Sequence, residues 1–212
     1  PEILIIPGVE WTTMRIHLNF LGIMDYPHRI PQYPSDEEIK YAIKEAKKLG
    51  AVVQVDHITW TKNEPKHRDG SVVHPTREQL VDWGVDGFEI NNETRWYDPK
   101  TVLWLNKMRE EKKLPRPIYV STGTDIHSPL GELASGWTEL LITEEEKKKP
   151  KWEIVKKALL DARTRIWVDH DYYRPNEIKY LKLEQKLLRE RICPPLFALK
   201  HGIEKMPGTI AG

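Results

Sequence analysis

Short runs rich in apolar residues alternate with amphipathic stretches along most of this chain. The runs predict buried strands at residues 3–6, 51–55, 86–90 and 117–120. Between them, apolar residues recur every three or four positions, which predicts helices over residues 36–49, 99–113 and 151–162. This alternation is typical of an α/β fold whose short strands are covered on both faces.

Polar/apolar alternation and capping residues predict further strands, the two ends of a helix and the loops. Residues 15–23 alternate polar and apolar positions and predict a strand, as do residues 137–143 and 165–168. Ser35 is followed three residues later by Glu38, a capping-box pattern that predicts a helix start, and Gly50 predicts its end. The segments without periodicity predict loops at residues 24–34 and 59–73.

Length, charge and cysteine content limit the domain organisation and the kinds of partner that this chain could have. The 212 residues predict one α/β domain over residues 1–175, followed by a helix and tail over residues 176–212. Thirty-three basic and 32 acidic residues give a net charge of +1, which does not indicate nucleic acid as a partner. No apolar run is long enough to span a membrane, and the single cysteine excludes an internal disulfide framework.

Candidate metal ligands follow the predicted strands. Glu10, His57, Asp125 and His127 each come just after a predicted strand. His17 lies early in the strand predicted over residues 15–23, which follows Glu10. Each alone has a simpler interpretation as a surface carboxylate, a core histidine or a turn cap. Together, nitrogen and oxygen donors without a thiolate favour a catalytic metal site that binds Zn, Mn or Fe.

Five segments carry a resemblance to a known family. They are, in order, residues 6–10 (IPGVE), the strand with His17, residues 55–57 (VDH), residues 85–90 (VDGFEI) and residues 123–128 (GTDIHS). This order resembles the later motifs of the PHP (polymerase and histidinol phosphatase) family over residues 3 to about 170. The resemblance implies a distorted (β/α)7 barrel that holds one to three divalent metal ions and hydrolyses phosphate esters.

The same resemblance implies roles for the candidate ligands. Glu10 would bridge two metals, and His17 and His57 would complete the shell of one of them. Asp125 would bind the other bridged metal, and His127 a third. The implied reaction is attack of a metal-activated water on a small phosphorylated substrate, with Glu10 and Asp125 as the central carboxylates.

The sequence departs from the family pattern at its start. The His-x-His pair of the family's opening strand is absent, and the chain begins at Pro1 within a predicted strand. We therefore expect a barrel without its first strand and a preceding segment that completes it. Two alternatives stay open: a degenerate barrel with a binding or scaffolding role, and an amidohydrolase-like enzyme that cleaves a non-phosphate bond.

Weaker candidates surround this set. His74 precedes a predicted helix and, with Arg68 in the same loop, could reach a phosphate, although a simple helix-entry turn also explains His74. Asn91, with Glu89 and Asn92, ends a predicted strand and could contact substrate or support a metal ligand. Trp60 could stack on a ring of the substrate.

Overall fold

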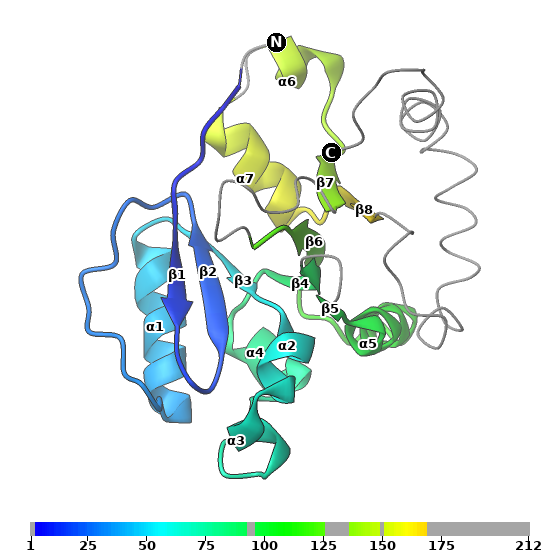
Figure 1. Cartoon of the computed structure of the whole chain (residues 1–212). Helices are drawn as coiled ribbons and strands as arrows, with labels where there is room; N and C mark the ends of the chain where they lie inside the picture. Colours follow the sequence, from blue (N-terminus) through cyan, green and yellow to red (C-terminus); the bar gives the residue numbers. More distant parts are fainter. Residues whose placement is uncertain (1–2, 93–95, 126–135, 149–150, 169–212) are drawn as a thin grey trace, which may run out of the picture. The chain divides into compact units, whose positions relative to one another are not determined.

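The computed structural model describes residues 3–92, 96–125, 136–148 and 151–168 (Figure 1). The chain divides into two compact units, Pro1–Tyr172 and Tyr173–Gly212, and every described residue belongs to the first. The helix and tail predicted over residues 176–212 lie outside the described residues.

The described residues form eight strands and seven helices. The strands are β1 (Gly8–Thr12), β2 (His17–Leu21), β3 (Val52–Val55), β4 (Gly87–Asn92), β5 (Trp96–Tyr97), β6 (Tyr119–Gly123), β7 (Gly136–Leu140) and β8 (Thr164–Val168). The helices are α1 (Asp36–Lys48), α2 (Ile58–Asn63), α3 (Pro65–Arg68), α4 (Arg77–Trp83), α5 (Pro99–Glu110), α6 (Glu144–Lys148) and α7 (Trp152–Leu160).

The predicted (β/α)7 barrel is wrong. In the described part of the chain, β1 to β6 form one open mixed sheet, and β7 pairs only with β8 in a separate antiparallel ladder. The pairs β1–β2, β2–β3 and β4–β5 are antiparallel, whereas β3–β4 and β4–β6 are parallel. Since β1 pairs only with β2 among the residues that the structure describes, this sheet has an edge there and does not close.

A tight hairpin explains this departure from the barrel. A parallel crossover needs a dozen or more residues, usually with a helix, and only four residues separate β1 from β2. Within this turn the Thr13 hydroxyl donates to the Ile16 carbonyl at 2.7 Å and also accepts from the Ile16 amide at 3.0 Å. The chain therefore reverses at once, and β1 runs antiparallel to β2.

One face of the sheet is apolar and makes the main core. Alternate residues of β2, β3 and β4 on this face are fully buried, namely Leu18, Phe20, Val53, Val55 and Phe88. Helix α1 packs against β3 and buries an apolar stripe that consists of Ile39, Ala42, Ile43 and Ala46. This face and its helix therefore supply much of the hydrophobic burial that holds the sheet.

The other face changes character along the strands. At one end Val52 and Tyr119 are buried with Leu159 of α7, and Leu21 and Trp152 pack against them. Further along, the same face carries polar side chains, namely Glu10, His17, Asn19, Gln54, Asp56, Glu89 and Ser121. We call this set the polar face.

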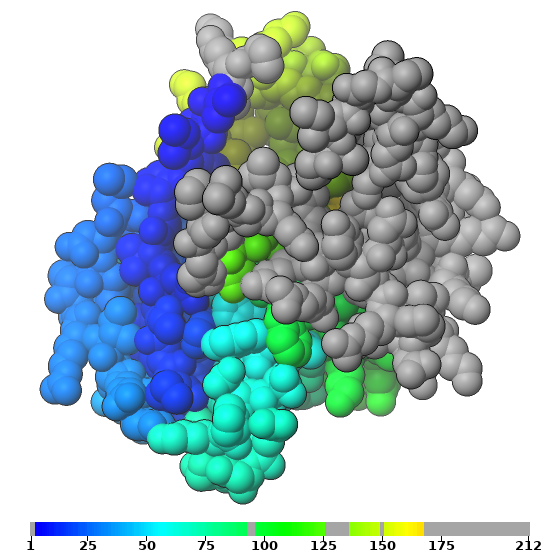
Figure 2. All heavy atoms as spheres, in the orientation of Figure 1, coloured from blue at the N-terminus to red at the C-terminus, as the bar shows by residue number. Residues whose placement is uncertain are grey.

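Two predicted elements differ from the structure. Residues 3–6 form no strand, and Ile3 and Ile5 are 87% and 85% exposed. Pairing starts only at Gly8, after Pro7, which has no amide hydrogen to donate. Figure 2 shows the segment before β1 at the surface, in dark blue. The polar residues 59–73, predicted as a loop, form most of α2 and all of α3.

Several local predictions are confirmed. Ser35 caps α1 by accepting from the Glu38 amide, and the Glu38 side chain accepts from the Ser35 amide. Strands β3, β4, β6 and β8 overlap the residues predicted for them, although β6 begins two residues and ends three residues later than predicted. None of the helices in the described residues combines the length and the apolar character that crossing a membrane would require.

Candidate metal centre

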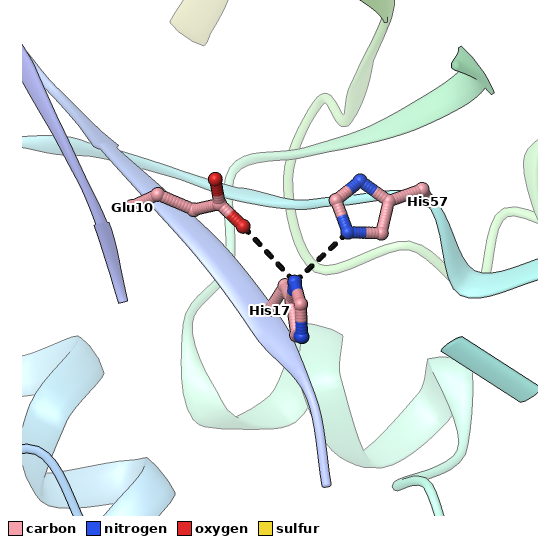
Figure 3. A group of neighbouring side chains, drawn as sticks. All are labelled: Glu10, His17 and His57. Carbon is pink, nitrogen blue, oxygen red and sulfur yellow. Dashed lines mark hydrogen bonds and ion pairs between the residues drawn. The ribbon is translucent and has the colours of Figure 1, made fainter. Parts of the chain in front are cut away.

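Glu10, His17 and His57 converge on one point of the polar face (Figure 3). Glu10 Oε1 and His57 Nε2 both lie 2.9 Å from His17 Nδ1. All three atoms lie within 4.8 Å of one another, and within the described ranges this is the one group of such side chains that could hold a metal ion. The predicted convergence of these three residues is therefore confirmed.

The β1–β2 hairpin brings the first two ligands together. Thr12 lies opposite His17 in the ladder, so Glu10 is the diagonal neighbour of His17 on the same face. Glu10 is thus in the middle of a strand, and His17 begins one. The prediction that Glu10 follows the carboxyl end of a parallel strand is wrong, although the contact that it implied is present.

His57 comes from a strained turn between β3 and α2. Its backbone has φ 20° and ψ 53°, a conformation that residues other than glycine rarely adopt. The Glu89 carboxylate accepts the His57 amide N–H at 2.9 Å, and His57 Nδ1 lies 3.2 Å from the same Oε2 atom. Strain of this kind is held in place by surrounding contacts and is common at functional sites.

The donor atoms fit a cation better than they fit one another. One proton on His17 Nδ1 can be donated well to Glu10 or to His57, but not to both at once. Either the Glu10 oxygen or the His57 nitrogen is then an acceptor that lies 2.9 Å from His17 Nδ1 without a hydrogen bond. Bond lengths of 2.0–2.1 Å to a tetrahedral metal correspond to ligand separations of about 3.3 Å, so a cation needs only small shifts here.

The site is closed on one side and open on the other. The Trp60 ring centre lies 5.4 Å from the His17 ring and 5.2 Å from the His57 ring, so this indole forms a wall. The His57 side chain is 6% exposed, whereas the Glu10 side chain is 40% exposed. A ligand could therefore approach from the Glu10 side.

The protein environment favours charge on these groups. The hydrogen bond from the His17 side chain, opposed by partial burial, lowers the pKa of Glu10. Burial acts to lower the pKa of His57, but the hydrogen bond to Glu89 and the charges of Asp56 and Glu89 raise it overall. The local field is therefore negative, which suits a bound cation.

A buried polar network lies beside the group. Asp56 Oδ1 accepts from Asn19 at 3.0 Å and from Gln54 at 2.9 Å, while Gln54 Oε1 accepts from the Tyr119 and Ser121 hydroxyls. Burial and the charge of Glu89 raise the pKa of Asp56 well above its usual range. Asn19, Gln54 and Asp56 were not predicted as site residues, although the polar positions within residues 52–57 (VVQVDH) were a usable signal.

The other predicted site residues are dispersed. Asp125 follows β6 with φ 47° and is half-buried, and it is not a member of the three-residue group. His127 lies outside the described residues. Arg68 ends α3 and is exposed.

The remaining substrate-binding candidates are buried. His74 is 5% exposed, and its Nδ1 donates to the Pro75 carbonyl at 2.7 Å, so it makes a local structural contact. Asn91 is fully buried and donates to Thr122 Oγ1 at 3.3 Å, which joins β4 to β6.

No protein-family model matches this chain, and no match was found among the curated proteins. The geometry of the site thus carries the functional argument. A His/Glu group that could hold a metal ion lies on the polar face of an open mixed sheet.

Proposed function

We propose that this protein is a metal-dependent hydrolase that cleaves phosphate esters, with the metal held by Glu10, His17 and His57. The observation that carries the proposal is the convergence of one carboxylate oxygen and two imidazole nitrogens within 4.8 Å. Three such ligands without a thiolate are typical of a catalytic site that keeps a position for water. Zn, Mn and Fe are the metals that suit this donor set.

The chain's own residues would divide the work. When bound, a divalent cation supplies Lewis acidity, which lowers the pKa of water and offsets phosphate charge. One carboxylate and two neutral imidazoles neutralise only part of the charge of a divalent cation. The cation and its ligands together would therefore stay positive and attract an anionic substrate. Trp60 shields the histidine side from solvent, and the exposed Glu10 side leaves room for the ester.

The choice of phosphate esters has a separate support. The short segments with Glu10, His57 and Asp125 resemble motifs of the PHP family, whose members hydrolyse phosphoesters. The open sheet does not share the barrel of that family, so this support is limited to the residues and their order.

The test is hydrolysis by the purified chain loaded with Zn, Mn or Fe. Phosphate monoesters, phosphodiesters and amides are compared for the wild type, for the His17→Ala/His57→Asn variant, and for a His28→Asn control on another part of the surface. We expect metal-dependent release of phosphate that the double variant loses and the control retains. Metal binding without turnover would favour a binding role, and turnover of amides alone would favour the amidohydrolase alternative.

A further inference from the structure

Glu89 is held in an unusual position for a buried carboxylate. It is 5% exposed and lies on β4, and within the described residues no lysine or arginine side chain pairs with it. Its Oε2 atom accepts from the His57 amide at 2.9 Å and lies 3.2 Å from His57 Nδ1. Asn92 adds a weaker donor at 3.4 Å. The carboxylate is thus directed at His57, both at its backbone and at its ring.

This contact decides which nitrogen of His57 is available. A carboxylate oxygen can only accept, so the 3.2 Å contact with Glu89 assigns the proton to His57 Nδ1. The Asn92 amide nitrogen lies 3.3 Å from the same ring nitrogen and, in this assignment, donates to Glu89 instead. The lone pair of the neutral ring is then on Nε2, the atom that lies 2.9 Å from His17 Nδ1. Metal-binding histidines commonly donate their other ring N–H to a carboxylate, which fixes the orientation of the ring.

Gly123 makes room for this carboxylate. A Cβ atom at Gly123 would lie 2.0 Å from Glu89 Oε1, far inside contact distance. Gly123 lies in β6 and does not have a positive φ, so its backbone conformation does not require glycine. The glycine of the Gly-x-Asp segment is therefore explained by the space that Glu89 occupies.

We propose that Glu89 is a positioning residue for the metal group: seated over Gly123, it holds His57 so that Nε2 faces Glu10 and His17. This inference rests on the proposed metal site. It adds to that site Glu89 as a positioning residue and Gly123 as the residue that leaves space for its carboxylate. It also links β6 to a metal group whose ligands come from β1, β2 and the end of β3.

The first test measures zinc affinity by competition with a chromophoric chelator. Glu89→Gln keeps the size of the side chain and removes its charge, and we expect the Kd to rise about 10- to 100-fold. The control is Glu45→Gln on α1, which removes another carboxylate that lies near a histidine, His28, at 3.6 Å. An unchanged Kd in Glu89→Gln, with the wild type binding zinc, would overturn the inference and leave the proposed site intact.

A double-mutant cycle tests whether the Glu89 carboxylate depends on the space above Gly123. Gly123→Ala should raise the Kd about 10-fold in the wild type and change nothing further in a Glu89→Ala background, because the displaced group is gone. Gly8→Ala, also in a strand without a positive φ, is the matched control. Independent, additive effects of Gly123→Ala and Glu89→Ala would contradict the seating of Glu89.

A third measurement needs no metal. In ¹⁵N–¹H spectra of the metal-free protein, the ring of neutral His57 should carry its proton on Nδ1, and this preference should be lost in Glu89→Gln. A wild type with the proton on Nε2 would overturn the inference, whereas the absence of metal binding with the Nδ1 form intact would count against the proposed function alone.

Discussion

The two faces of the same sheet differ in role: one forms the apolar core and the other carries the candidate metal ligands. Alternate residues of β2 and β3 enter the apolar core, while the residues between them form the polar face with its histidines and carboxylates. Phe20 and Val53 are fully buried against other apolar groups, and their neighbours Asn19 and Gln54 hold Asp56 by hydrogen bonds. The apolar face therefore fixes the strand register, and the register places the ligands of the polar face.

This comparison predicts that damage to the two faces has different consequences. The largest effect on stability should follow Phe20→Ala, which we expect to lower the free energy of unfolding by about 3–5 kcal/mol because a fully buried ring is removed. Denaturant titration measures this change. On the polar face, Glu10→Gln should alter the unfolding free energy by less than about 1 kcal/mol, since its side chain is 40% exposed and the change keeps its size. Equal losses in both variants would contradict the comparison.

The largest effect on metal affinity should come from the polar face. We expect His57→Asn to weaken zinc binding by at least about 100-fold, because it removes a ligand, and asparagine tolerates the positive φ at this position. Isothermal titration calorimetry of the folded variant measures the loss. Val53→Ala, one strand position away from the polar Gln54, serves as the control and should bind zinc with wild-type affinity.

A buried histidine outside both faces should make the protein sensitive to acid. Burial lowers the pKa of His74 to about 3, below the value of about 6.5 in the unfolded chain. The unfolded state therefore binds more protons as the pH falls through 6.5, and stability is lost. From pH 7 to 4.5 this loss amounts to about 2.5 kcal/mol. We expect His74→Asn to show a smaller loss by that amount in denaturant titrations, and parallel losses in both proteins would contradict this expectation.

The smallest predicted effect concerns the helix that covers the apolar face. Ser35→Ala removes the hydroxyl that accepts from the Glu38 amide and should lower the unfolding free energy by about 1 kcal/mol. Lys151→Ala at the start of α7, where no side chain caps the helix, is the matched control and should change stability little. An equal response at both positions would show that the capping box contributes nothing measurable.

The sequence predicted local structure better than topology. The capping box of α1 and the apolar run of β3 depend on neighbours along the chain, and both predictions are confirmed. The apolar residues 3–6 have the composition of a strand but no partner before Gly8, and pairing cannot be inferred from composition. The barrel was wrong because the short turn between β1 and β2 forms an antiparallel hairpin, where the family pattern implied parallel strands.

The candidate site was predicted in part, but the backbone arrangement that forms it differs from the predicted one. Glu10, His17 and His57 do meet, but through diagonal pairing in a hairpin and a strained turn, not at the common rim of a barrel. Asp125 is not part of the group, because two strands, β3 and β4, separate β6 from β2, and β6 contacts the ligands only indirectly, through Gly123 and Glu89. The buried support of Asp56 depends on long-range register that the sequence alone does not specify.

The most direct test of the central claim is X-ray absorption at the zinc edge of the zinc-loaded chain. Two imidazoles and light oxygen ligands in the first coordination shell, with one imidazole lost in each of His17→Ala and His57→Asn, are the predicted result. A shell without histidine, or one that both substitutions leave unchanged, would show that Glu10, His17 and His57 do not hold the metal.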